Sequence, residues 1–147
     1  MKKRVLICAV IALLGLQNIY AQNTYTNPVI RKYLADPSVI KANDGWFYVY
    51  ATESAGLAIP IYKSLNLVDW TFVGSAFTKA GRPTFVKNGW LWAPDINYIN
   101  GKYVLYYSMS VWGGEWECGI GVATSSSPSG PFKDHGKLFT SSEIGVR

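Results

Sequence analysis

The feature that most constrains the fold is a pattern of four short strands that the chain repeats. The first copy opens with Ser38 to Lys41 and Trp46 to Tyr50, two runs rich in β-branched and aromatic residues. Asn43-Asp44-Gly45 between them predicts a tight hairpin turn, because glycine adopts a positive φ at low cost. A third strand is expected over Ala58 to Lys63, and a fourth follows the polar turn after it.

The second copy has the same plan. Ile96 to Ile99 and Lys102 to Tyr107 flank Asn100-Gly101, which is among the strongest short hairpin signals. A third strand is expected over Gly119 to Thr124, again followed by a polar turn and a fourth strand. Equivalent positions in the two copies are 56 residues apart at the hairpin turns and 62 apart at the fourth strands. The difference falls in the loop from Ser110 to Glu117.

Antiparallel strands in groups of four, recurring at about 60 residues, are typical of the blades of a β-propeller. We therefore predict an all-β fold in residues 22–147, made of two four-stranded propeller blades. Two blades form part of a ring, because propellers close with about four to eight. A single eight-stranded sandwich or barrel is the alternative, since short and evenly spaced strands suit that fold as well.

The N-terminus predicts export. Residues 1–21 have the pattern of a signal peptide: three cations at Lys2 to Arg4, an apolar run from Val5 to Leu16, and a small residue, Ala21, at the expected cut. This run is too short to span a bilayer. We therefore expect an exported protein, periplasmic or extracellular, that does not contact a membrane once the signal peptide is removed.

Charge and cysteine content narrow the function. The whole chain carries +5, but residues 22–147 contain 11 basic and 9 acidic groups and no run of Lys or Arg. The sequence therefore predicts no nucleic-acid partner. Cys8 lies in the predicted signal peptide, which leaves Cys118 without a partner for an intramolecular disulfide. Cys118 and the single histidine, His135, show no metal-ligand spacing, so no metal site is predicted.

Carboxylates combined with aromatic residues favour carbohydrate chemistry. Sugars stack their apolar faces on Trp and Tyr, and hydrolysis of a glycosidic bond uses two carboxyl groups. Asp36 precedes Pro37 ahead of the first strand, and Asp95 follows Trp92-Ala93-Pro94 at the comparable place in the second copy. Aspartate beside proline is also a common turn former, so a purely structural role is the alternative for both.

Two segments carry a resemblance to a known family. Leu34-Ala35-Asp36-Pro37-Ser38-Val39-Ile40 precedes the first hairpin, and Trp90-Leu91-Trp92-Ala93-Pro94-Asp95-Ile96 leads into the second. With their hairpins they resemble glycoside hydrolase family 43, most closely its endo-1,5-α-L-arabinanases, from about residue 27 onward. The resemblance implies a five-bladed propeller, of which this chain supplies about two blades.

The resemblance also implies roles for particular residues. It implies inverting hydrolysis of α-1,5-arabinofuranosyl bonds in a plant cell-wall polysaccharide, arabinan or an arabinoxylan-type oligosaccharide. Asp36 matches the general base, and Asp95 is expected to line or brace the pocket. Trp92 is a candidate platform for a sugar ring, as are Trp112 and Trp116 on the loop; packing within the blades is the alternative for all three. No cofactor is expected to be required, and a structural calcium ion in the complete ring is left open.

The expected general acid and the carboxylate that tunes its pKa have no matching position here. The resemblance places both in later blades, so we expect this chain to be the N-terminal part of the enzyme and to be inactive alone. A β-xylosidase or an exo-acting α-L-arabinofuranosidase of the same family is one alternative. A non-catalytic carbohydrate-binding product, or a truncated product that does not fold, is another.

Overall fold

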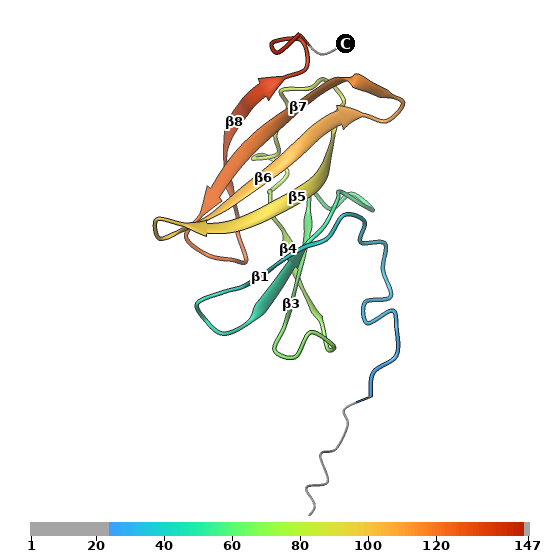
Figure 1. Ribbon diagram of the computed structural model, residues 1–147, viewed down its shortest axis with the longest axis vertical. Helices are drawn as coiled ribbons and strands as arrows, with labels where there is room; N and C mark the ends of the chain where they lie inside the picture. The colour runs from blue at the N-terminus through green and yellow to red at the C-terminus, as the bar shows by residue number, and fades with distance from the viewer. Residues whose placement is uncertain (1–23, 146–147) are drawn as a thin grey trace, which may run out of the picture.

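The computed structural model describes residues 24–145, which form two four-stranded antiparallel sheets (Figure 1). The first sheet has the strand order β1-β2-β3-β4 and the second has the order β5-β6-β7-β8, so every strand pairs with its neighbour in sequence. The predicted signal peptide lies outside the described residues. The strands are β1 Ser38–Lys41, β2 Phe47–Tyr50, β3 Pro60–Ser64, β4 Thr71–Ser75, β5 Trp90–Ile99, β6 Lys102–Val111, β7 Gly114–Ser125 and β8 Lys133–Thr140.

The two sheets confirm the all-β prediction and the division into units of four strands. Between residues 24 and 145 no strand ladder joins the first sheet to the second, which excludes a single closed barrel. Each sheet is a separate meander, as in successive blades of a propeller. In the part of the chain that the structure describes, no helix is long and apolar enough to cross a membrane.

Both predicted hairpin turns are present. In the first, Gly45 has a φ of 85°, and Ala42 donates a backbone hydrogen bond of 2.8 Å to the carbonyl of Trp46. In the second, Asn100 and Gly101 have φ values of 50° and 80°. A two-residue turn with positive φ at both positions matches the twist of the strands that it joins. Asn100 and Gly101 therefore set the register of the second hairpin.

The strand that contains Asp95 is longer than predicted. We expected it to begin at Ile96, whereas β5 begins at Trp90 and runs through Pro94. Proline has no N–H to donate to a strand ladder, and β5 accommodates it where the register with β6 shifts between Trp92 and Asp95. The second motif therefore lies in a bulged strand and not ahead of it.

The predicted loop between Ser110 and Glu117 is mostly strand. β6 continues to Val111 and β7 begins at Gly114, so only two residues connect them. Trp116 therefore lies in β7, contrary to its expected place on a loop. The extra residues of the second unit lengthen the β6–β7 hairpin, because antiparallel pairing continues from Val111 and Gly114 onward.

The hydrophobic core lies between the two sheets, and β1 and β2 lie beside β5. Its largest fully buried side chains come from both units: Tyr50, Ile59 and Ile61 from the first, and Leu91, Leu105, Tyr107 and Met109 from the second. Hydrogen bonds add to this packing. Phe132 donates a backbone bond of 2.7 Å to the carbonyl of Ala76, and the Tyr50 hydroxyl donates to the carbonyl of Pro128. The sheets therefore form one packed body.

Candidate active site

Asp36 lies immediately before β1, where a hydroxyl group holds its carboxylate. Its φ is 50°, in the left-handed region that aspartate tolerates better than most other residues. Thr52, just after β2, donates a hydrogen bond of 2.7 Å from Oγ1 to Oδ2 of Asp36. Asp36 is exposed, whereas Thr52 is buried. The protein therefore fixes one carboxylate oxygen of a residue that still faces solvent.

The second motif contacts Thr52 as well, through the backbone of Ala93. Ala93 has a φ of 42°, and its N–H donates a hydrogen bond of 2.9 Å to Oγ1 of Thr52. The structure thus brings the backbone of this motif to the threonine that holds the aspartate of the first motif. Asp95 is exposed and accepts a bond of 2.9 Å from Nδ2 of Asn97. Its expected role in lining or bracing the pocket stays a prediction.

An ion pair secures the same junction. Glu53 donates its backbone N–H to the carbonyl of Leu91 at 2.8 Å. Its Oε2 atom accepts hydrogen bonds from the Leu91 N–H at 3.0 Å and from the Arg82 guanidinium at 2.6 Å. Arg82 also donates to the carbonyls of Gly89 at 2.9 Å and Pro83 at 3.2 Å. The side chains of Arg82 and Glu53 are 27% and 13% exposed, so the pair is largely shielded from water.

Trp92 is the middle ring of a stacked group that we call the tryptophan trio: Trp90, Trp92 and Trp112. Its ring centroid lies 6.0 Å from that of Trp90 and 5.4 Å from that of Trp112, with interplanar angles of 24° and 29°. Its indole N–H donates to the carbonyl of Ser110 at 3.1 Å. The trio and Val111 line a hollow of about 500 Å³. With Trp112 77% exposed, the trio offers solvent an aromatic surface.

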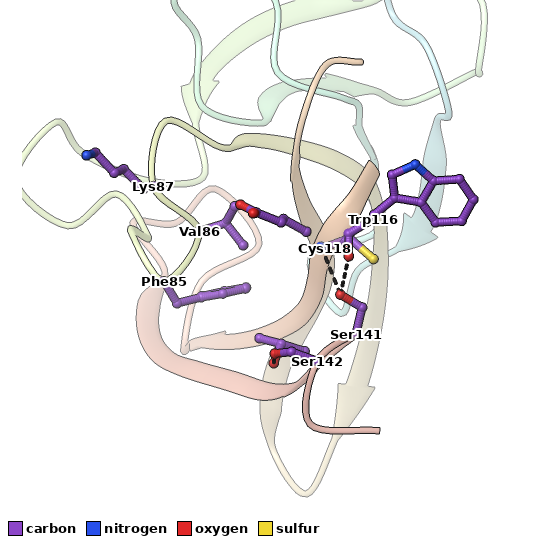
Figure 2. A pocket seen from close by; sticks show the side chains of 9 residues that line it. Phe85, Val86, Lys87, Trp116, Cys118, Ser141 and Ser142 are labelled. Carbon is purple, nitrogen blue, oxygen red and sulfur yellow. Dashed lines mark hydrogen bonds between the residues drawn. The ribbon is translucent and has the colours of Figure 1, made fainter. Parts of the chain in front are cut away.

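Trp116 belongs to a separate hollow of about 490 Å³, where β7 begins and β8 ends (Figure 2). Ser141, which follows β8, is linked to the beginning of β7 by two hydrogen bonds. Its hydroxyl donates to the carbonyl of Trp116 and accepts a bond of 3.4 Å from the Cys118 N–H. Trp116 is 74% exposed, and Figure 2 shows its indole turned away from Phe85. Among residues 24–145, no ring contact joins Trp116 to the tryptophan trio.

Burial and charge shift the pKa of a few groups. Burial raises the pKa of the Tyr50 and Tyr107 hydroxyls, and for Tyr107 the hydrogen bond to Asp134 raises it further. Hydrogen bonds from Lys137 and Thr140 lower the pKa of Glu143. The described residues include no group of three His, Cys, Asp or Glu side chains that could hold a metal ion.

Sequence reasoning assigned no role to four residues that hold the junction between the sheets: Ser38, Thr52, Glu53 and Arg82. Ser38 accepts a hydrogen bond of 3.2 Å at Oγ from the backbone N–H of Ile96, 58 residues away. The Thr52 and Glu53 contacts with β5 span 38 to 41 residues. The one local signal was the polar Thr52-Glu53 pair, which is separated from the end of β2 by one residue. Long-range contacts of this kind leave no periodic pattern in a sequence.

Comparisons with known proteins identify the family of the chain. The family model described as "Glycosyl hydrolases family 43" matches residues 25–146. The extracellular endo-α-(1→5)-L-arabinanase 1 of Bacillus subtilis is 39% identical over 117 residues, which are 74% of this chain and 35% of the relative. The chain thus spans about a third of that relative's length.

Two solved structures have the same fold. The native Bacillus subtilis arabinanase is 35% identical with a TM-score of 0.65, over 75% of this chain and 39% of that one. The Cellvibrio cellulosa α-L-arabinanase, solved with arabinohexaose, is 32% identical with a TM-score of 0.59, over 73% of this chain and 35% of that one. Because the family match covers nearly every described residue, the chain belongs to the glycosyl hydrolases of family 43.

Proposed function

We propose that this chain carries the catalytic base of an enzyme that cuts α-1,5-linked arabinan internally, with inversion at the anomeric carbon, and that the base is Asp36. The observation that carries the proposal is the environment of this carboxylate. Asp36 faces solvent, and the buried Thr52 hydroxyl holds its Oδ2 atom at 2.7 Å. Within residues 24–145, Oδ1 has no hydrogen-bond partner, so it is free to accept one from water.

This geometry suits the base of an inverting hydrolysis. In that reaction the carboxylate accepts a proton from water while the water oxygen bonds to the anomeric carbon. The bond from that carbon to the glycosidic oxygen breaks, and a carboxylic acid protonates the departing oxygen. The two carboxyl groups must be about 6.5–9.5 Å apart to leave room for the water. Asp36 has the open oxygen that the first of these steps requires.

Two glutamates of the chain fit the acid role poorly. A general acid must keep its proton near neutral pH, which requires a raised pKa. Hydrogen bonds from Lys137 and Thr140 instead lower the pKa of Glu143. Glu53 binds the Arg82 guanidinium and the Leu91 N–H through its Oε2 atom, and these contacts hold its carboxylate at the junction between the sheets. We therefore assign the general acid to neither residue.

The aromatic surfaces and the relatives support arabinan as the substrate. Indole rings stack on the apolar faces of sugars, and Trp112 and Trp116 are 77% and 74% exposed. We propose that Trp92, Trp112, Trp116 and Asp95 contact the sugar chain. The Bacillus relative is named an extracellular arabinanase, and the Cellvibrio structure contains arabinohexaose. Together with the N-terminal pattern, the first of these names also supports export of this chain.

The test uses the full-length protein, meaning the complete enzyme that we propose contains this chain. It is incubated with linear α-1,5-arabinan, and separately with xylo-oligosaccharides, and the products are followed over time. Short arabino-oligosaccharides are expected early from arabinan, and NMR of the first product is expected to show the inverted anomer. Release of monosaccharide alone would favour an exo-acting enzyme, and preferential cleavage of xylo-oligosaccharides a xylosidase. Either result, or a retained anomer, contradicts the proposal.

A further inference from the structure

One buried hydroxyl group joins the two sequence motifs. Thr52 is 5% exposed, and its Oγ1 atom donates to Oδ2 of Asp36 at 2.7 Å and accepts from the N–H of Ala93 at 2.9 Å. A threonine hydroxyl has one proton to donate. Because Ala93 supplies an N–H, that proton must point to Asp36. Both bonds therefore have fixed roles, and Thr52 bridges the two motifs directly.

The bridge ends at two residues with unfavourable backbone conformations. Asp36 and Ala93 have φ values of 50° and 42°, where side chains other than glycine are disfavoured. The penalty persists only where the surrounding structure enforces the conformation. Both positions are restricted further, since Asp36 precedes Pro37 and Ala93 precedes Pro94. Thr52 contacts the carboxylate of one strained residue and the amide of the other.

The backbone on both sides of Thr52 is itself held. Its own N–H donates to the carbonyl of Ala35 at 3.0 Å, and the next N–H, that of Glu53, donates to the carbonyl of Leu91 at 2.8 Å. The ion pair between Glu53 and Arg82 secures that second contact. The hydroxyl therefore sits on a fixed support between Asp36 and β5.

We propose that Thr52 is a positioning residue for Asp36: its hydroxyl holds the carboxylate in register with the bulge of β5 and leaves Oδ1 to contact the attacking water. The catalytic part of this inference rests on the proposed function. Thr52 itself touches neither water nor sugar in this account. Its effect on turnover comes through the orientation of Asp36, because displacement of a catalytic group by about 1 Å can lower a rate by about 100-fold.

The test compares Thr52→Val with Thr52→Ser in the full-length protein. Valine keeps the shape of the side chain but can neither donate nor accept, whereas serine keeps the hydroxyl. We expect Thr52→Val to lower kcat on linear α-1,5-arabinan by about 10- to 100-fold, with KM changed by less than about threefold. Thr52→Ser is expected to keep kcat within about threefold of the parent. A split of this kind separates positioning from substrate binding.

A second measurement needs no activity. Hydrogen exchange of the Ala93 amide, followed by NMR, reports the bridge directly, since that amide donates to Thr52. Thr52→Val is expected to speed its exchange by about tenfold or more relative to amides in β6, and Thr52→Ser to keep it slow. The control is Ser64→Ala, which removes another fully buried hydroxyl of the first sheet, one that bonds Asn66. It should leave the Ala93 amide and kcat unchanged.

Each outcome is decisive. If Ala93 exchange is unchanged in Thr52→Val, the bridge does not exist and the inference fails. If exchange accelerates while kcat stays within about twofold, Thr52 is structural only and the positioning role is overturned. If the parent protein does not cleave arabinan, the proposed function fails, and the exchange measurement still decides whether Thr52 joins the motifs.

Discussion

The two sheets differ in regularity, although they share one strand plan. Strands of the first sheet have four or five residues, whereas those of the second have eight to twelve. Four residues of the first unit other than glycine have positive φ: Asp36, Ala55, Ile59 and Leu67. In the second unit and the segment leading to it there are three, and two of them are asparagines, Asn88 and Asn100.

The difference in backbone regularity indicates different roles for the two units. Asparagine tolerates positive φ, whereas Ala and the branched Ile and Leu adopt it at a cost. The first unit therefore contains irregular connections that surrounding contacts must hold, and Asp36 is in one of them. At Asp36, part of that support comes from β5 of the second unit, through Thr52 and the N–H of Ala93. Changes in the second sheet should affect stability, and changes at the junction should affect the geometry of the site.

The largest stability effect is expected at Gly121, in the middle of the second sheet. A Cβ atom there would lie 2.4 Å from the ring and hydroxyl of Tyr107, which is fully buried. Gly121→Ala should therefore lower the free energy of unfolding by about 3 kcal/mol, measured by urea denaturation. Gly114→Ala is the control, since its Cβ would lie no closer than 3.5 Å to Val111. Equal effects of the two changes would contradict the tight packing of β6 on β7.

The next effect is expected at the junction between the sheets. Arg82→Met leaves Glu53 without its ion-pair partner at a position that is only 13% exposed, and should cost about 2 kcal/mol of unfolding free energy. Lys137→Met removes the exposed ion pair with Glu143 and should change the free energy of unfolding far less, because water screens exposed pairs. If both changes had the same small effect, Glu53 would not hold β5 in the way that the structure indicates.

A smaller effect separates two buried tyrosines, one from each sheet. Tyr107 donates to the carboxylate of Asp134 at 2.6 Å, whereas Tyr50 donates to the neutral carbonyl of Pro128. Hydrogen bonds to charged groups contribute more, so Tyr107→Phe should cost about 1.5–2 kcal/mol and Tyr50→Phe about 1 kcal/mol. Thermal unfolding of the two variants measures the order, and the reverse order would contradict this assignment.

The smallest effect is a pH dependence at the exposed end of the second sheet. Hydrogen bonds from Lys137 and Thr140 lower the pKa of Glu143 below its ordinary value of 4.5. A lowered pKa in the folded state stabilises the fold above the ordinary value, and this stabilisation is lost as pH falls through the lowered pKa. The Tm of the parent should exceed that of Glu143→Gln slightly at pH about 7. The gap should close in acid, and a gap that widens would refute the sign.

Local signals in the sequence predicted the strands and turns, whereas contacts between residues far apart in the sequence could not be predicted from it. Asn100-Gly101 predicted its hairpin because positive φ at both positions is a property of those two residues. The extent of β5 was missed because Pro94 argues locally against a strand, and only pairing with β6 on both sides of the bulge overrides it.

The site divides in the same way. Asp36 and residues 92–95 were found from their motifs, and the structure links them through Thr52. Neither the threonine bridge nor the ion pair between Glu53 and Arg82 could be predicted, because each depends on how two sheets pack. The stacking of Trp92 between Trp90 and Trp112 likewise depends on the pairing of β5 with β6.

The most direct test of the account is the turnover of Asp36→Asn on linear α-1,5-arabinan, with Asp95→Asn as its matched control from the second motif. Asparagine keeps the size of the side chain and can still accept the Thr52 hydrogen bond, but it cannot take a proton from water. We predict that Asp36→Asn lowers kcat by about 100-fold or more while arabinohexaose binding stays within about threefold, and that Asp95→Asn loses less. Near-normal turnover of Asp36→Asn would contradict the account.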